Sequence, residues 1–486
     1  MSKKQYPGVP IRGHILSAPI SETLRSRPGL APFIGFLLAL MICLSSSLAF
    51  AGGVADAYMP PTPWVIPFVI MLLCIAILPL VAEHQWHSNR NKLVVSVVLG
   101  TPVLILFAIN NPHALLHTGE EYVSFIALLG ALFVVSGGIL LTGDLRATPL
   151  NNTLILAIGA LFASFMGTTG AAMVLIRPIL KTNEQRQYKT HTVIFFIFLV
   201  CNIGGCLTPL GDPPLFLGYL KGVPFGWTFG LWLQWLIVCL ALLVVYFIWD
   251  SILYGKEPGE RMIRDRMEEK PLRVHGLPLN APLLVGIICS VAFLRHDFFL
   301  FDREVAMLVL AALSMKFTAR PIREGNHFNF YPINEVAVLF FGIFLTMIPA
   351  IELLRIRGGD LGVTSPMQFF WYTGILSSFL DNAPTYVTFL SLGDAVTQDM
   401  LAAGKDITTV GLISPLRSIS EEILVAISLG AVFMGANSYI GNAPNFMVKA
   451  IAESRKVDMP SFGGYMVYST IVLVPIFLVV TFIFLT

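Results

Sequence analysis

A series of apolar segments, each about as long as a membrane is thick, constrains this chain more than any other feature. Uncharged, apolar runs lie at 63–82, 93–109, 122–142 and 226–249. A helix needs roughly 20 such residues to cross the hydrocarbon core of a bilayer. Because a backbone in lipid must satisfy its own hydrogen bonds, runs of this kind are expected to be helical. The sequence therefore predicts an all-α polytopic membrane protein with the lipid bilayer as its surroundings.

The composition supports this class and excludes others. Of the 486 residues, 56% are hydrophobic and only 12% are charged, whereas soluble domains carry roughly 25% charged residues. The net charge of +2 gives no indication of a nucleic-acid partner. The six cysteines lie in apolar segments without a metal-ligand spacing, so we interpret them as small hydrophobic residues. No nucleotide-binding loop, zinc motif or nucleophile constellation is present, and we expect neither an enzyme nor a cofactor.

The N-terminal segment 1–62 is expected to contain a cytoplasmic stretch and a first helix. Residues 1–29 are polar and basic, and the apolar run that follows ends in SLAFAGG. That ending has the small residues of a signal-peptidase site, so one alternative is that the first helix is removed. The long leader favours an uncleaved helix instead.

The apolar run 365–393 carries polar residues at its centre. Asp381 and Asn382 stand there beside Pro384. A charge at membrane depth is expensive and by default marks a functional site. Proline removes an N–H and disfavours helix at the preceding residue, and free backbone groups at that depth are tolerated only where they line a cavity. We predict a re-entrant helical hairpin with a polar tip. The alternative is a spanning helix with a proline kink.

The two halves of the chain carry corresponding interruptions. The run 152–180 is broken by Met-Gly-Thr-Thr-Gly and is predicted to be a hairpin like that at 365–393. The runs 190–220 and 420–452 contain GCLTPLGDPPLF and GANSYIGNAPNF, which align with Asp212 opposite Asn442. Each half thus has one interrupted hairpin followed by one unwound helix. Such paired interruptions indicate the central binding site of a transporter.

This correspondence predicts two repeats. The first covers 63–249 and the second 281–486, joined by a cytoplasmic linker at 250–280 in which basic and acidic residues alternate. A mixed charge run of this kind is typical of a solvated linker.

The distribution of basic residues predicts the orientation. If both hairpins return to the side from which they enter, the chain crosses the membrane about eleven times in two inverted-topology repeats. Loops 51–62 and 110–121 then face one side without any Lys or Arg, while 1–29 and 181–189 face the other with several. By the positive-inside rule the N-terminus is cytoplasmic and the C-terminus is outside, as in a multi-pass protein of the cell inner (plasma) membrane.

Two opposed hairpins and two unwound helices resemble the ion transporter superfamily, over roughly residues 60–486. The motifs SSFLDNAPTY, NIGGCLTPLGDPP and GANSYIGNAPNF are most similar to NhaD-type sodium:proton antiporters and the related citrate transporters. The resemblance implies a homodimer whose hairpin domains move by an elevator-like alternating-access motion. Anion symporters of the superfamily have Ser-Asn-Thr at both tips. This chain departs from them, with Gly167-Thr168-Thr169 at one tip and Asp381-Asn382-Ala383 at the other.

The tip residues favour a cation over an anion. An Asp at the tip would repel a carboxylate substrate by about 4 kcal/mol at 4 Å and an effective dielectric near 20, whereas small cations take oxygen ligands. Burial favours the neutral form of a carboxyl group, so Asp381 or Asp212 is expected to hold either a proton or Na⁺. This predicts Na⁺/H⁺ antiport, with Na⁺ at Asp381, Asn382 and Asp212. Neutral oxygens are expected from Asn382, Thr385, Thr168, Thr169, Asn202, Thr208, Asn437, Ser438 and Asn442.

A second role remains open for Asp212, and two rival functions remain open for the chain as a whole. Asp212 precedes Pro213 and is also placed to cap the helix that starts there, a role compatible with ion binding. The chain as a whole could be a Na⁺-coupled citrate or dicarboxylate symporter, in which the carboxylates bind only the coupling ions and helix N-termini hold the anion. A channel-like or scaffold protein with the same fold is the third hypothesis.

Other charged residues have weaker predictions. Arg177 is expected to extend toward the cytoplasmic interface, with anion binding as the alternative. Glu335 starts a helix and is expected to complement its dipole. His113 and His117 lie in an outside loop, where a solvated role is expected and pH sensing is the alternative.

Overall fold

The computed structural model describes residues 58–486 apart from residue 87 and residues 295–301. The expected first helix and its SLAFAGG ending lie outside the described residues. Within them, helices predominate and four short strands are the only sheet structure, which confirms the all-α polytopic membrane fold. The eleven crossings stay a prediction. Eight helices of the described part are long and apolar enough to span a membrane: Thr62–Val81, Asn89–Asn110, Pro112–Ser136, Pro149–Met166, Thr190–Leu207, Trp227–Tyr254, Tyr331–Leu361 and Phe462–Phe484.

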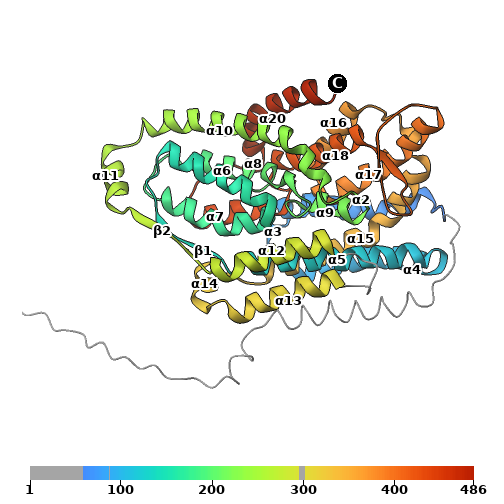
Figure 1. Cartoon of the computed structure of the whole chain (residues 1–486), viewed down its shortest axis with the longest axis horizontal. Coiled ribbons are helices and arrows are strands. Elements are labelled where there is room, and N and C mark those ends of the chain that lie inside the picture. Colours follow the sequence, from blue (N-terminus) through green and yellow to red (C-terminus); the bar gives the residue numbers. More distant parts are fainter. Residues whose placement is uncertain (1–57, 87, 295–301) are drawn as a thin grey trace, which may run out of the picture.

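One group of helices, which we call the scaffold bundle, packs together along one long side of the molecule (Figure 1). Its central member α5 (Pro112–Ser136) is buried along most of its length, because its side chains are apolar on nearly every face. The other members are α2 (Ile66–Val81), α4 (Asn89–Asn110), α12 (Leu277–Phe293), α13 (Asp302–Phe317) and α15 (Tyr331–Arg357). Most of them pack directly on α5, and α2 packs on α4 and α15.

The remaining long helices, which we call the site-bearing helices, form the other layer of the molecule (Figure 1). The outermost are α10 (Trp232–Tyr254) and α20 (Phe462–Phe484). Both leave large apolar side chains exposed, among them Phe247 and Ile471. An apolar surface on a long apolar helix is what a lipid environment requires, because lipid solvates such side chains as well as a protein core does.

Both expected hairpins are pairs of helices that meet at the predicted tips. The first consists of α6 (Pro149–Met166) and α7 (Thr168–Thr182), separated by Gly167 alone. Gly167 has φ +79°, a conformation that glycine adopts without the steric penalty of a side chain. The second consists of α16 (Pro366–Phe379) and α17 (Asn382–Ala402). The chain is therefore broken at Asp381, and the re-entrant course of both hairpins stays a prediction.

Both expected unwound helices are also broken where the sequence predicts. The first half has α8 (Thr190–Leu199), η2 (Ile203–Leu207) and α9 (Pro213–Leu220). The second half has α18 (Glu421–Met434), η5 (Gly435–Asn437) and α19 (Ala443–Ser454). In each half an extended residue directly precedes a proline-containing first turn, because proline is accepted there without loss of a helical hydrogen bond.

The segment expected as a solvated linker contains ordered structure. It forms α11 (Gly259–Met267), in which no residue is buried, and then β2 (Lys270–His275), in which every residue is exposed. β2 pairs antiparallel with β1 (Leu140–Asp144), with Leu140 opposite His275. The remaining short elements are η1 (Thr62–Val65), α3 (Glu83–Trp86), η3 (Trp227–Leu231), α14 (Arg320–Gly325), η4 (Gly358–Leu361), β3 (Thr409–Gly411) and β4 (Ser418–Ser420).

Candidate functional site

The hairpin tips lie directly against the two helix breaks. The N–H of Thr168, the first residue of α7, donates to the Gly211 carbonyl at 2.8 Å. The N–H of Asn382, the first residue of α17, donates to the Gly441 carbonyl at 3.2 Å. N–H groups at a helix start have no partner within the helix. Each break therefore satisfies a group that the opposing tip leaves free.

Serine clamps hold each tip to its break in the same way in both halves. The carbonyl of Ser164 accepts a hydrogen bond from the Thr208 hydroxyl, and the carbonyl of Ser378 accepts one from the Ser438 hydroxyl. The alignment of GCLTPLGDPPLF with GANSYIGNAPNF places Thr208 opposite Ser438. The approach is close enough to require glycine, because a Cβ at Gly441 would lie 2.7 Å from the Ser377 carbonyl oxygen.

Asp212 lies where all four interrupted segments converge. Its carboxylate accepts hydrogen bonds from Thr168 Oγ1 at 3.0 Å, Asn382 Nδ2 at 2.6 Å and Asn442 Nδ2 at 2.8 Å. The side chain is fully enclosed, with 1% exposure. Within the described part of the chain, no Lys, Arg or His forms an ion pair with it. Three predicted site residues from both tips and the second break thus surround one carboxylate.

Asp212 occupies a helix-capping position, but its side chain does not cap the helix. Asp212 is the residue before α9, yet its side chain makes no hydrogen bond to that helix's N–H groups. A buried ionised carboxylate without a cationic partner loses several kcal/mol of solvation, and three hydrogen bonds offset only part of it. The site is therefore chemically suited to gain either a proton or a small cation.

Neutral oxygens without partners accompany this carboxylate. The amide oxygens of Asn202, Asn382 and Asn437 are buried and have no hydrogen-bond partner. Two of these side chains flank the same glycine, because a Cβ at Gly435 would lie 3.0 Å from Asn202 Oδ1 and 3.5 Å from Asn382 Nδ2. Buried acceptors without partners are rare in proteins and ask for an explanation. A bound Na⁺ would take such oxygens as ligands.

Asp381 has a different environment from Asp212. It caps α17, with Oδ1 accepting from the Ala383 N–H at 3.0 Å. It is only partly buried and lines a cavity together with Thr168, Thr169 and Asn442. Thr385 is also close, but its hydroxyl donates to the Asp381 carbonyl within the helix at 2.9 Å.

The cavity, of about 340 Å³, separates the tips from the scaffold bundle. Its walls are mostly apolar. The charged side chains lining it are Asp381 on one wall and Lys92 and Glu335 on the other, which gives a formal charge of −1. Lys92 pairs with Glu335, Nζ to Oε1 at 2.5 Å. The sequence predicted only that Glu335 complements the dipole of its helix. Its pairing with Lys92 on α4 was missed, because the position of a residue in one helix gives no information about contacts with another helix.

Some predicted residues lie behind the cavity wall. Asp212, Asn202 and Asn437 do not line the cavity and form a second layer behind Asn442 and the tips. Asn202 Nδ2 donates to Asn445 Oδ1 at 2.8 Å. Asn445 was not predicted, although it stands within the GNAPNF motif as a further amide beside the second break.

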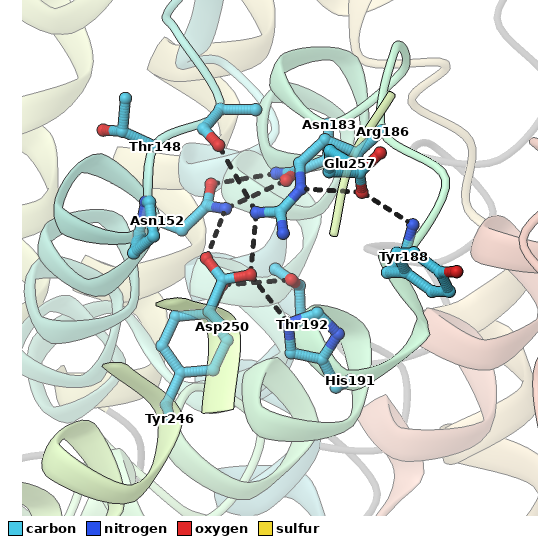
Figure 2. Close-up of polar contacts among 12 residues, drawn as sticks. Thr148, Asn152, Asn183, Arg186, Tyr188, His191, Thr192, Tyr246, Asp250 and Glu257 are labelled. Atoms are coloured by element: carbon cyan, nitrogen blue, oxygen red, sulfur yellow. Dashed lines mark hydrogen bonds and ion pairs between the residues drawn. The ribbon is translucent and has the colours of Figure 1, made fainter. Parts of the chain in front are cut away.

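The sequence analysis also missed a buried charged cluster at the base of the first hairpin (Figure 2). Its centre is Asp250, which is fully buried and contacts Arg186 Nη1 at 2.7 Å and His191 Nε2 at 2.8 Å. Asn152 Nδ2 lies 3.3 Å from the same carboxylate, and Arg186 reaches Glu257 at 3.4 Å. The cluster joins α6, α8 and α10 to the loop after α7, which carries Arg186, and to Glu257 after α10. Arg186 lies in the predicted basic loop 181–189, but it is buried against Asp250 and Glu257.

Two further predictions concern charged residues away from the cavity. Arg177 does not line the cavity, and its Nη1 is buried without a hydrogen-bond partner. His117 is not a plain solvated residue, because its Nδ1 lies 3.2 Å from Glu121, which in turn pairs with Lys221 at 2.6 Å.

Comparison with known proteins identifies a family. A family model described as "Putative citrate transport" matches residues 57–485, a range that includes both hairpins, both breaks and the scaffold bundle. No curated protein matches the chain.

Proposed function

Since the chain belongs to the family described as "Putative citrate transport", and is thus a secondary transporter of the membrane, we propose that it exchanges Na⁺ for H⁺ at buried carboxylates. The observation that carries this proposal is the enclosed Asp212 carboxylate, surrounded by three neutral donors and by amide oxygens without partners. A group of this kind accepts a proton or a small cation. It accepts only one of them at a time, so occupancy by one excludes the other.

Exchange follows from this exclusion. When Asp212 and Asp381 are deprotonated, their charge holds Na⁺ with help from the amide oxygens of Asn202 and Asn382. When either proton binds, the electrostatic attraction for Na⁺ is lost and the ion leaves. One set of carboxylates that holds both ligands in turn gives antiport without a second site. The tips and breaks carry the site together, which supports a motion that carries all four interrupted segments past the scaffold bundle.

The proposed setting is the cell inner membrane, with the N-terminus in the cytoplasm and two copies meeting through their scaffold bundles. The orientation rests on the basic loops, and the dimer on the superfamily resemblance. Neither enters the exchange chemistry, which needs only one copy of the chain and the lipid around it.

The test is pH-driven ²²Na⁺ uptake into proteoliposomes that contain the purified protein. Asp381→Asn keeps a side chain that caps helices well, so the protein should assemble normally while exchange is lost. Asp399→Asn, on the exposed side of the same helix, is the matched control and should exchange like the wild type. Wild-type rates in Asp381→Asn would refute the proposal.

A second candidate function has its own supporting observation. The cavity volume of about 340 Å³ falls in the range of small-molecule sites and exceeds what a bare ion needs, which favours Na⁺-coupled symport of citrate or a dicarboxylate. Addition of citrate separates the two functions. In a symporter citrate stimulates Na⁺ uptake, and in an antiporter it leaves uptake unchanged.

A further inference from the structure

The wall of the cavity opposite Asp381 carries the ion pair Lys92–Glu335. Lys92 extends from the start of α4, and Glu335 lies in the second turn of α15. The Lys92 side chain is 3% exposed, whereas a third of the Glu335 side chain is exposed. Trp86 and Tyr331 cover the ammonium, each with its ring centroid 5.9 Å from Nζ. Lys92 and Glu335 both line the cavity, and Glu335 is the more exposed of the two.

A purely structural role does not explain this arrangement well. The pair does join α4 to α15. Burying charges costs solvation free energy, however, and apolar side chains of similar size would join the helices without that cost. An ion pair used only to hold two helices together gains nothing from facing a cavity. The same pair does change the electrostatic potential inside the cavity, because its apolar walls screen charge weakly.

We propose that Glu335 recruits the transported cation into the cavity and that Lys92 is a positioning residue, which holds the Glu335 carboxylate in place at the cavity wall. This inference rests on the proposed cation exchange and adds a residue outside the tips and breaks. An ion entering the cavity meets Glu335 on the scaffold wall and then the Asp381 carboxylate on the opposite wall. The titratable and charged groups that face Glu335 are Lys92 from α4, Tyr331 from its own helix and Asp381 across the cavity.

The two residues should respond differently to substitution. Glu335→Gln leaves the Lys92 ammonium uncompensated beside the cavity. A unit charge about 10 Å from a cation, at an effective dielectric near 20, changes its affinity by roughly tenfold. We therefore expect the KM for Na⁺ to rise roughly tenfold with little change in kcat. In Lys92→Gln the carboxylate remains but loses the partner that holds it in place, so the rise in KM should be smaller than in Glu335→Gln.

The experiment measures the KM and kcat of Na⁺ uptake in proteoliposomes between pH 6 and 9, at low and at high ionic strength. Lys92→Arg keeps the ion pair and should restore the wild-type KM, which a loss of packing would not predict. The double variant Lys92→Gln/Glu335→Gln leaves no net charge and should lie closer to the wild type than Glu335→Gln does. Glu352→Gln is the matched control, because Glu352 pairs with Arg355 on the same helix away from the cavity.

The outcomes separate this inference from the proposed function. Wild-type exchange together with an unchanged KM in Glu335→Gln would overturn the inference alone. A double variant as impaired as Glu335→Gln, with a lower thermal stability than Glu352→Gln, would show a structural pair and overturn it as well. A wild-type protein that exchanges no Na⁺ would overturn the proposed function, and the recruitment role with it.

Discussion

The first and second halves of the molecule build their interrupted segments with the same hydrogen bonds but place their carboxylates differently. In the first half the acidic residue is Asp212, in the break, while the tip has Gly167 and Thr168. In the second half the acidic residue is Asp381, at the tip, while the break has Asn442. The duplicated backbone contacts show what the fold requires. The acidic residue lies in the break of the first half but at the tip of the second half, so the two halves differ in their chemistry.

This difference gives the two carboxylates unequal surroundings. Asp212 is enclosed and receives hydrogen bonds from three side chains, whereas Asp381 lines the cavity and receives one from its own helix. In the proposed exchange, an ion in the cavity reaches Asp381 before Asp212, which supplies charge from behind. The comparison implies that neither carboxylate substitutes for the other, and the following predictions test that implication.

Replacing the enclosed carboxylate should have the largest effect. Asp212→Asn removes the charge and also brings an NH₂ group toward the donors of Thr168, Asn382 and Asn442. We expect pH-driven Na⁺ uptake to fall more than 100-fold, since a site without its charge binds neither ligand. Uptake into proteoliposomes measures this loss, and size-exclusion profiles in detergent report whether the protein still folds. Uptake above a tenth of the wild-type rate would contradict the prediction.

Exchanging the two break residues should restore part of the function. Asp212 and Asn442 touch through a hydrogen bond of 2.8 Å, so Asp212→Asn/Asn442→Asp keeps one carboxylate and one amide in contact. We expect uptake within about tenfold of the wild type, because a shift of a few ångströms changes the Coulomb energy of the ion only moderately. If the double variant is as inactive as Asp212→Asn, the position of the charge matters more than its presence.

Removing a single donor should have a smaller effect. Thr168→Val deletes one of the three hydrogen bonds to Asp212, which is worth about 1 to 2 kcal/mol because the acceptor is charged. The KM for Na⁺ should change five- to twentyfold. Thr385→Val is the matched control, since its hydroxyl bonds only to backbone within α17, and its KM should stay within twofold. Equal effects in both variants would argue against a special role for the Asp212 cluster.

The smallest expected effect concerns the hydroxyls of Ser164 and Ser378, whose backbone carbonyls would keep their hydrogen bonds from Thr208 and Ser438. Ser164→Ala and Ser378→Ala each remove hydroxyl contacts at equivalent places, including those to Gly204 and Met434. Each should lower stability by about 1 kcal/mol, a typical value for a buried hydrogen bond. Thermal unfolding of the purified variants measures this, and we expect similar changes in the two halves. A large difference between them would show that the two tips are not held alike.

The tips and breaks could be predicted because glycine, proline and polar residues inside an apolar run have few compatible structures. The break at Asp381 and the start of α9 after Asp212 lie where those residues place them. The correspondence of Thr208 with Ser438 was also visible in the alignment of the two halves, and the structure gives both hydroxyls the same partner type. What the alignment did not reveal is that these hydroxyls donate to backbone carbonyls.

Contacts between distant segments could not be predicted in this way. Lys92 and Glu335 are 243 residues apart, and hydropathy locates each near a helix end without indicating a partner. Arg186 was assigned to a loop by its charge, yet it is buried against Asp250. From a single sequence, hydropathy indicates how deep in the membrane a residue lies. It does not indicate which side chain on another helix the residue contacts.

The ribbon of β1 and β2 has a mechanical consequence. The chain leaves the scaffold bundle after α5 through β1 and returns to it before α12 through β2, and the two strands are paired side by side (Figure 1). In the described part of the chain three connections join the layers, and the third runs from α15 to α16 through η4. The first two are held together as one ribbon by the pairing of β1 with β2. Any sliding of one layer past the other would therefore have to move these two connections together.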